Sequence, residues 1–185
     1  MNATVAVAGP GDVADLIFLG RKTFIETYKG VGERPAGLEE AYGREAFNET
    51  VLLPQLSSRG PVFFLGRVDG AAAGFLKLDF GPVPACVPDK GAAQVAQIYV
   101  LKEFHGGGLG KKLLSAALEA AAERGRSSLW LEAWERNLTA LEFHRRMGFS
   151  AVGKAPWVFK AAGYDYQDMD LVMHRPAKLA PEKLS

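Results

Sequence analysis

The chain has 185 residues, of which 48% are hydrophobic and 23% charged, with a formal net charge of +1, a composition typical of one globular domain. The near-neutral charge disfavours nucleic acid or an acidic membrane as a partner, because binding to phosphate-rich surfaces usually shows as a basic surplus. The single cysteine, Cys86, excludes an internal disulfide, and the lack of a basic leader or a long apolar run predicts a cytoplasmic protein without a membrane span.

The first half of the chain mixes strands and helices that are separated by glycine and proline. Its periodicity predicts strand Thr4–Ala8, helix Asp12–Tyr28, short helices Leu38–Tyr42 and Ala46–Gln55, and strands Val62–Val68 and Ala73–Phe80. Asp69-Gly70, between the last two strands, is typical of a tight hairpin turn. Gly81–Gly91 is a proline-rich loop.

The second half continues the alternation and ends in a pair of strands. Its pattern predicts strand Val95–Val100, helix Gly108–Arg124, strand Leu129–Ala133, helix Leu138–Met147, and strands Phe149–Phe159 and Asp165–His174. No linker divides the chain, so we expect one domain over residues 1–175 and a flexible tail over residues 176–185.

The segment between the strand that ends at Val100 and the next helix carries four glycines within five positions, Gly106–Gly110. Glycine leaves the backbone open to a ligand, and a helix start offers unpaired N–H groups with about half a positive charge. Together they predict a cradle for phosphate oxygens. A dinucleotide-binding fingerprint lacks its acidic ribose contact here, and a Walker loop lacks the hydroxyl after Lys111. A plain flexible turn is the remaining alternative.

Two motifs give this loop a family context. His105-Gly106-Gly107-Gly108-Leu109-Gly110, directly after a strand, resembles the acetyl-coenzyme A motif Gln/Arg-x-x-Gly-x-Gly/Ala of GNAT N-acetyltransferases. The segment Asn137–Phe149 resembles their second motif, Asn-x-x-Ala-hydrophobic-x-Phe-Tyr-x-x-x-Gly-Phe. The resemblance covers residues 4–174, and Ile98–Phe104 and Gln167–Met173 are most similar to the bacterial polyamine N-acetyltransferase branch.

The resemblance implies an α/β (α+β) fold with a mixed, mainly antiparallel sheet of about seven strands, flanked by helices, whose two central parallel strands splay apart. It also implies acetyl-coenzyme A as the cofactor, without a metal. The pyrophosphate is then expected over the backbone of the glycine loop, and the pantetheine arm along the exposed edge of Ile98 and Val100. The implied cofactor-binding residues are Ile98, Tyr99, Val100, His105, Gly106, Gly107, Gly108, Leu109, Gly110, Lys111, Asn137 and His144.

Acetyl transfer to an amine needs a base for the amine proton, a donor for the oxyanion and a proton for the thiolate. The Val100 N–H is the expected oxyanion donor. His144 replaces the usual tyrosine of the family and is a candidate acid, because imidazole titrates near neutral pH; a packed helix histidine is the alternative. The glutamates of the polyamine branch are missing from the cofactor strand, so a water chain held by Gln97 and Tyr99 is the first candidate for the base.

The acceptor is expected to contact Glu26, Tyr28, Asp79, Trp134 and Trp157. The two carboxylates are alternative bases or orient the acceptor, and aromatic faces attract ammonium groups, although core packing explains the aromatic residues equally well. The segment 30–60 is long enough to cover a small substrate, which favours a closed pocket over an open groove.

These features predict an acetyl-coenzyme A-dependent N-acetyltransferase that acts on a primary amine of a small molecule by direct attack in a ternary complex, with polyamines as the leading acceptors. Acetylation of a protein amino terminus or lysine is a second hypothesis, and a non-catalytic acetyl-coenzyme A sensor is a third. The habits of the family also make a homodimer an expectation.

Overall fold

The structure is a computed structural model that describes residues 2–30 and 33–176. The expected tail lies outside the described residues, apart from Pro176, which ends the last strand. In chain order, the helices and strands are β1 (Ala3–Val7), α1 (Val13–Tyr28), α2 (Leu38–Ala46), α3 (Glu49–Leu56), β2 (Val62–Val68), β3 (Ala71–Asp79), β4 (Ala93–Val100), α4 (Leu109–Glu123), β5 (Ser128–Trp134), α5 (Leu138–Arg146), β6 (Ser150–Ala161) and β7 (Tyr164–Pro176). No helix of the described residues has the length and apolar character needed to cross a membrane.

The strands join one seven-stranded sheet in the order β1-β2-β3-β4-β5-β7-β6. Neighbouring strands are antiparallel except for β4 and β5, which run parallel at the centre. The predicted mixed, mainly antiparallel sheet is therefore confirmed. Asp69 and Gly70 form the turn between β2 and β3 with φ values of 48° and 87°, the positive values that a tight hairpin turn requires.

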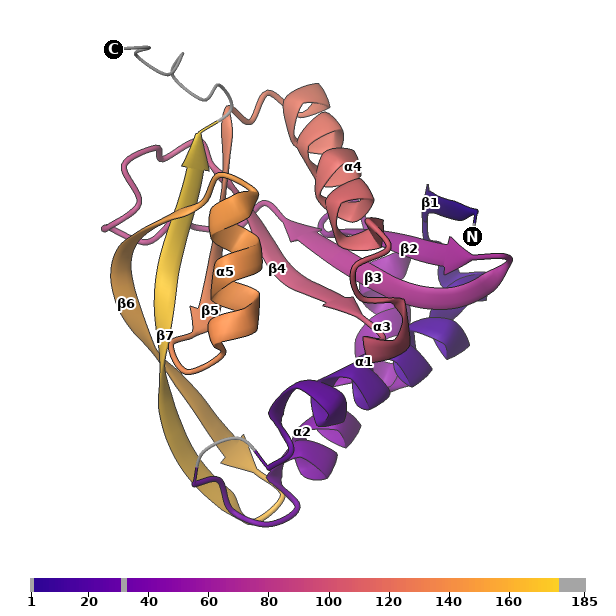
Figure 1. The fold of residues 1–185 in the computed structure, drawn as a ribbon, viewed down its shortest axis with the longest axis vertical. Coiled ribbons are helices and arrows are strands. Elements are labelled where there is room, and N and C mark those ends of the chain that lie inside the picture. The colour runs from indigo at the N-terminus through magenta and orange to yellow at the C-terminus, as the bar shows by residue number, and fades with distance from the viewer. Residues whose placement is uncertain (1, 31–32, 177–185) are drawn as a thin grey trace.

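Helices cover both faces of the sheet (Figure 1). On one face, α4 and α5 pack through a core that includes Leu113, Ala117 and Leu141. On the other face, α1 and α3 pack through a core that includes Leu19 and Leu52. Apolar residues at helical spacing thus mark the sides of α1 and α4 that meet the sheet.

The break between α2 and α3 falls later than the sequence predicts. α2 continues to Ala46, and α3 starts after Asn48, whose Oδ1 accepts the Val51 N–H at 3.0 Å. Phe47, between the two helices, packs so closely on Gly20 that a Cβ there would lie 2.2 Å from the Phe47 ring. The break therefore follows from a tertiary contact, which local periodicity does not report.

The two central strands stay together only where they begin. Within the described residues, the register of β4 and β5 holds two pairs, Ala93 with Leu129 and Gln94 with Trp130. Beyond these pairs β4 continues against β3, while β5 continues against β7. The splay that the resemblance implied is present, and it leaves one edge of β4 without a strand partner.

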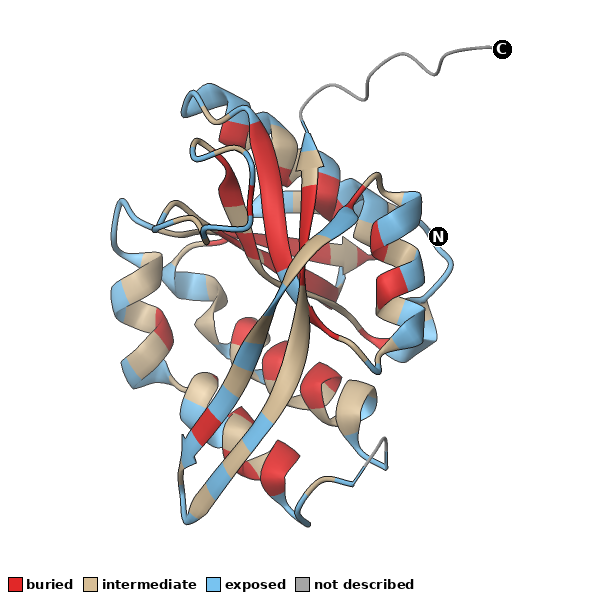
Figure 2. Ribbon diagram, turned by 90° about the vertical axis from the view of Figure 1, so that its left-hand side faces the viewer, coloured by how far each residue is buried: buried red, intermediate tan, exposed pale blue. Residues whose placement is uncertain are grey.

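β6 and β7 form a long twisted hairpin that reaches past the end of β5 towards α2 (Figures 1 and 2). Its far half is mostly half-buried or exposed. Phe159, near the tip, packs with Leu38 and Ala41 of α2. The hairpin, α2 and the end of α1 therefore surround the same side of the splayed strands.

Candidate active site

The glycine loop lies between the end of β4 and the start of α4. Gly106 and Gly108 have φ values of 79° and 80°, a conformation that L side chains rarely adopt. A Cβ added at either position would meet no atom within 4 Å, so the space above the loop is open. No side chain of the described residues caps α4, and the N–H groups of its first turn are available to an anion. The loop thus fits a diphosphate.

Two other residues that were predicted to bind the cofactor, Leu109 and Gly110, have roles in packing. The Leu109 side chain is buried, and its Cδ1 would lie 2.7 Å from a Cβ at Gly66. Gly110 lets α4 approach α5, since a Cβ there would lie 3.1 Å from the Phe143 ring. For these two residues, only the backbone N–H groups of the first turn face a ligand. Lys111 is exposed on the same turn.

The free edge of β4 presents alternate backbone groups to the splay. Leu101 N–H bonds the Ala73 carbonyl of β3 at 2.9 Å, so the backbone groups of Ile98 and Val100 point away from β3. Nε2 of His105 lies 2.8 Å from the Val100 carbonyl oxygen. The side chain of His105 therefore covers one acceptor of this edge, while the Val100 N–H keeps the orientation expected of an oxyanion donor.

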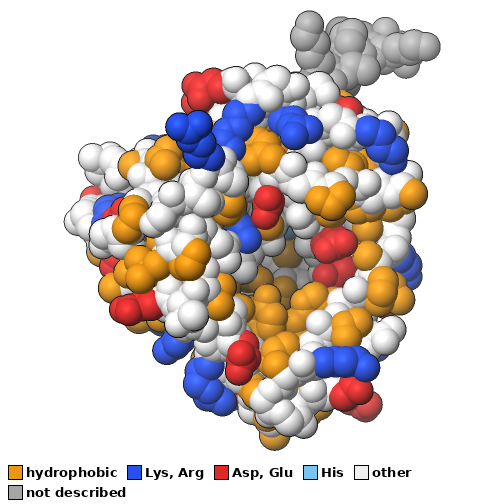
Figure 3. All heavy atoms as spheres, turned by 180° about the vertical axis from the view of Figure 1, so that it is seen from behind, with side chains coloured by type: hydrophobic (Ala, Val, Ile, Leu, Met, Phe, Trp, Pro, Cys, Tyr) orange, Lys and Arg blue, Asp and Glu red, His pale blue; other side chains and the backbone are white. Residues whose placement is uncertain are grey.

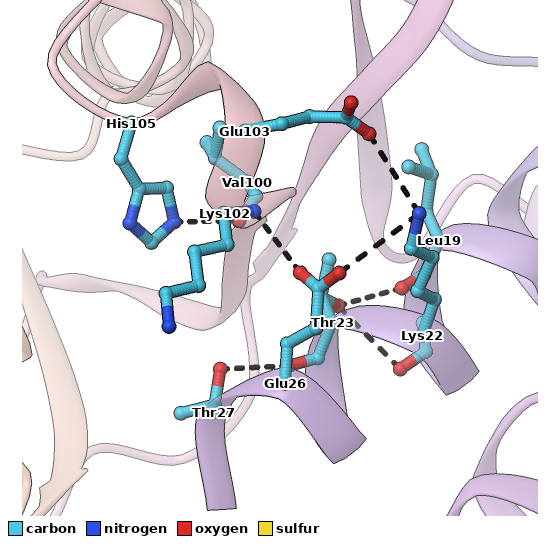
Figure 4. Close-up of polar contacts among 10 residues, drawn as sticks. Leu19, Lys22, Thr23, Glu26, Thr27, Val100, Lys102, Glu103 and His105 are labelled. Carbon is cyan, nitrogen blue, oxygen red and sulfur yellow. Dashed lines mark hydrogen bonds and ion pairs between the residues drawn. The ribbon is translucent and has the colours of Figure 1, made fainter.

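Glu26 of α1 lies beside the end of this edge (Figure 4). Its Oε2 accepts the Lys102 N–H at 3.0 Å, and its Oε1 lies 3.9 Å from Lys22 Nζ. These contacts give Glu26 a role in holding α1 against β4.

Gln97 and Tyr99 share the face of β4 that points towards α1, because strand residues two apart lie on one face. Burial raises the pKa of Tyr28 to about 12 and that of Tyr99 well above its ordinary value, and the two phenols hydrogen bond to each other. Both phenols therefore stay protonated at neutral pH and act as hydrogen-bond donors. Tyr28 also contacts the end of β5, with its ring 5.7 Å from that of Trp134.

Three carboxylates that sequence reasoning did not single out lie on the same face, across the splay from Tyr99. Asp170 of β7 pairs with Trp134 of β5, and Asp168 and Glu132 are each two residues away on these strands. Their alternation with apolar residues was visible in the sequence, but only the register of β5 and β7 shows that they share a face.

Asp170 is the most perturbed of the three carboxylates. Burial, together with the nearby charges of Glu132 and Asp168, raises the pKa of Asp170 to about 7, against the opposing charge of Arg34. The charge of Asp170 in turn raises the pKa of Tyr28 and Tyr99. Asp170 is therefore a carboxylate next to the phenol pair that can take up a proton near neutral pH.

Seen from the side opposite α4 and α5, the surface is hollowed at its centre, and hydrophobic and acidic side chains line the hollow (Figure 3). Trp134 and Trp157, both predicted to contact the acceptor, come together around the side chain of Arg34. Asp79 does not join them. It pairs with Gln94 at the start of β4, and because β3 and β4 are antiparallel, Val100 lies at the other end of the strand.

The two predicted residues of the second motif are on α5. Oδ1 of Asn137 accepts the Ala140 N–H at 3.1 Å, so it caps the helix. His144 is 5% exposed, and burial lowers its pKa to about 4. Within the part of the chain that the structure describes, its Nδ1 is buried without a hydrogen-bond partner. A neutral imidazole at pH 7 can donate a hydrogen bond but is a poor source of a proton for a thiolate.

A splayed parallel strand pair with a glycine loop at the next helix start defines the class of protein: an enzyme that holds a diphosphate-bearing cofactor beside an open strand edge. The sequence model of the Acetyltransferase (GNAT) family matches residues 28–149. An uncharacterised N-acetyltransferase from the region 3' of pepI in Lactobacillus delbrueckii subsp. lactis is 32% identical over 139 residues, which are 75% of this chain and 79% of that protein.

Another acetyltransferase sequence and a solved structure are also similar to this chain. Streptothricin acetyltransferase of Streptomyces lavendulae is 39% identical over 59 residues, which are 32% of this chain and 31% of that protein. The crystal structure of PaiA N-acetyltransferase from Thermoplasma acidophilum in complex with coenzyme A superposes with a TM-score of 0.74 at 21% identity, over 95% of this chain and 99% of that one. The chain belongs to the GNAT family of acetyltransferases, and it is an acetyl-coenzyme A-dependent N-acetyltransferase.

Proposed function

We propose that this enzyme acetylates a primary amine of a small, positively charged molecule, with polyamines as the leading acceptors. The carboxylates on the sheet face beside the splay, Glu132, Asp168 and Asp170, are the observation that carries the proposal. Carboxylates on a sheet face that also carries Trp134 favour a cation over a neutral or acidic acceptor. The cytoplasmic location expected from the composition belongs to the same proposal.

In this proposal, the chain positions the amine and removes its proton. An alkyl ammonium has an ordinary pKa near 10.4, so a base that takes up a proton near pH 7 assists its deprotonation. Asp170 is that base, and the phenols of Tyr28 and Tyr99 orient the amine or a water between them. Acetyl-coenzyme A, when bound, would supply the acetyl group as a thioester: the carbon–nitrogen bond forms at its carbonyl carbon, the carbon–sulfur bond then breaks, and coenzyme A leaves as a thiol, so that the proton lost by the amine nitrogen is balanced by the one gained by sulfur.

The remaining parts of the reaction are assigned to the loop and the strand edge. First-turn N–H groups after Gly108 hold the diphosphate, and Ile98 pairs with the pantetheine arm. The Val100 N–H donates to the carbonyl oxygen as negative charge develops there. His144, neutral at pH 7, donates a hydrogen bond towards the sulfur at most.

Release of free thiol from acetyl-coenzyme A, followed with a panel of amines, tests the proposal. We expect turnover with spermidine and other aliphatic amines and none with peptides that carry free amino termini or lysines. Turnover with peptides alone would favour a protein-modifying enzyme. Calorimetry with coenzyme A is run in parallel, because cofactor binding without turnover on any amine would favour a sensor.

A further inference from the structure

Arg34 occupies a cage built from parts of the chain that are far apart in the sequence. Its side chain is 5% exposed. Four aromatic rings surround the guanidinium carbon at distances to their centroids of 4.2 Å (Trp134), 4.6 Å (Tyr28), 5.5 Å (Trp157) and 5.7 Å (Tyr166). Arg34 Nη2 lies 3.5 Å from Asp168 Oδ2. We call these five residues, Tyr28, Trp134, Trp157, Tyr166 and Asp168, the cation cage.

The cage is preorganised for positive charge without help from Arg34. Asp168 Oδ2 accepts the Tyr166 hydroxyl at 2.9 Å, and Oδ1 accepts the Met169 N–H at 2.9 Å. Burial alone would raise the pKa of Asp168, but hydrogen bonds from Met169 and Tyr166 lower it. The cage therefore presents an ionised carboxylate and several π faces to one point, an arrangement that binds ammonium and guanidinium groups.

Arg34 provides the positive charge that the cation cage favours, but the cage does not provide hydrogen bonds to all of the guanidinium N–H groups. The Nε and Nη1 atoms of Arg34 are buried without a hydrogen-bond partner among residues 2–30 and 33–176. By contrast, Nη2 of Arg67 lies 2.6 Å from Asp15 and 3.3 Å from Asp12. Buried donors are nearly always paired, so the cage holds this guanidinium mainly through the aromatic rings and the ion pair with Asp168.

We propose that the cation cage is the subsite for a second, non-reacting cationic group of the acceptor, and that Arg34 fills it until the acceptor binds. The inference rests on the proposed function, because it assigns the reacting amine to Asp170. Asp168 and Asp170 lie two residues apart on one face of β7, about 7 Å along the strand, a spacing that suits two cations joined by a chain of about four carbons.

The test measures binding without cofactor. Agmatine carries a guanidinium and an ammonium joined by four carbons, whereas butylamine carries the ammonium alone. Trp134 and Trp157 in the cage provide an intrinsic fluorescence signal. Because Arg34 competes for the cage, its removal in Arg34→Gln should tighten agmatine binding at least tenfold. Arg44→Gln, a matched change at an exposed arginine of α2, should leave the affinity unchanged, and Arg34→Lys, which keeps a cation, should tighten it less than Arg34→Gln.

Unchanged or weaker agmatine binding by folded Arg34→Gln would overturn the proposal and make Arg34 a fixed part of the site. A second measurement needs no variant: the wild-type chain should bind agmatine at least tenfold more tightly than butylamine, and equal affinities would overturn the proposal as well. Neither measurement needs turnover. If no amine is acetylated, the proposed function is wrong, but the proposal for the cation cage still stands or falls by the binding measurements. If amines are acetylated but agmatine and butylamine bind with equal affinity, only the proposal for the cation cage is wrong.

Discussion

At the scale of single residues, Asp170 carries the most specific expectation for catalysis. Its pKa of about 7 means that it is protonated at pH 6 and ionised at pH 8. Replacement by asparagine in Asp170→Asn removes the base, and we expect kcat/KM to fall by about 100-fold or more. The loss should grow as the pH rises through 7 and then level off, because only ionised Asp170 accepts a proton. Steady-state rates between pH 5.5 and 9 measure this.

The matched control is Asp165→Asn, which makes the same change five residues away on β7, where Asp165 forms an exposed ion pair with Lys160. It should leave the pH profile unchanged. Using the ratio of wild-type to variant rates removes the titration of the amine substrate itself. A ratio that stays constant across this pH range would assign the proton transfer to another group.

The same carboxylate should lower stability above neutral pH. The folded pKa of Asp170 lies above its value of about 3.9 in an unfolded chain, so its contribution to stability falls as the pH rises from 4 to 7. Asp170→Asn should therefore stabilise the protein at pH 8 by roughly 2 kcal/mol, a figure reduced for solvent screening, and at pH 5 by only about a third as much. Urea unfolding at both pH values measures the difference; an equal effect at both would contradict the shifted pKa.

At the scale of elements, the glycine loop and α4 form one unit whose backbone shape matters more than its side chains. Gly108→Ala places a Cβ in open space at a φ of 80°. The substitution should therefore lower the stability of the unliganded protein only through backbone strain, by roughly 1 kcal/mol. A bound diphosphate would occupy that space. We expect the variant to weaken binding of coenzyme A at least tenfold in calorimetry.

Gly125 offers a control at the other end of the same helix. It has a φ of 69°, and a Cβ there would likewise meet no atom within 4 Å. Gly125→Ala should cost similar stability in thermal unfolding while leaving coenzyme A affinity unchanged. If both variants lost affinity to the same extent, general strain in α4 would explain the effect and the loop would not be the cofactor site.

Elements were also the level at which the sequence was most informative. Glycine spacing predicted the open loop at the start of α4, whose Gly106 and Gly108 have positive φ values, and the periodicity predicted the strand and the helix on either side of it. The acidic lining could not be predicted, because it depends on the pairing of Asp170 with Trp134 across β5 and β7. The assignment of Asp79 to the acceptor site was wrong because a strand pattern shows which face of the sheet a residue lies on, but not which end of the neighbouring strand it pairs with. Asp79 pairs with Gln94, at the end of β4 away from Val100.

At the scale of the whole molecule, the sheet consists of two halves joined at the start of β4 and β5, and the candidate active site lies where the halves diverge. β1 to β4 form one half, and β5, β7 and β6 form the other. Tyr28, at the end of α1, bridges them through Trp134. Arg34 could not be predicted from sequence because its surroundings come from both β5 and the distant hairpin. Side chains that meet only through this long-range assembly leave no local pattern.

The divergence of the two halves predicts which amides a bound cofactor protects. The N–H groups of Ile98 and Val100 face the splay, whereas those of Tyr99 and Leu101 face β3. Coenzyme A lying along this edge should slow hydrogen exchange at Ile98 and Val100 and leave their two neighbours nearly unchanged, as measured by NMR with and without the cofactor. Equal slowing at all four amides would indicate that binding stiffens the whole sheet without pairing along the open edge of β4.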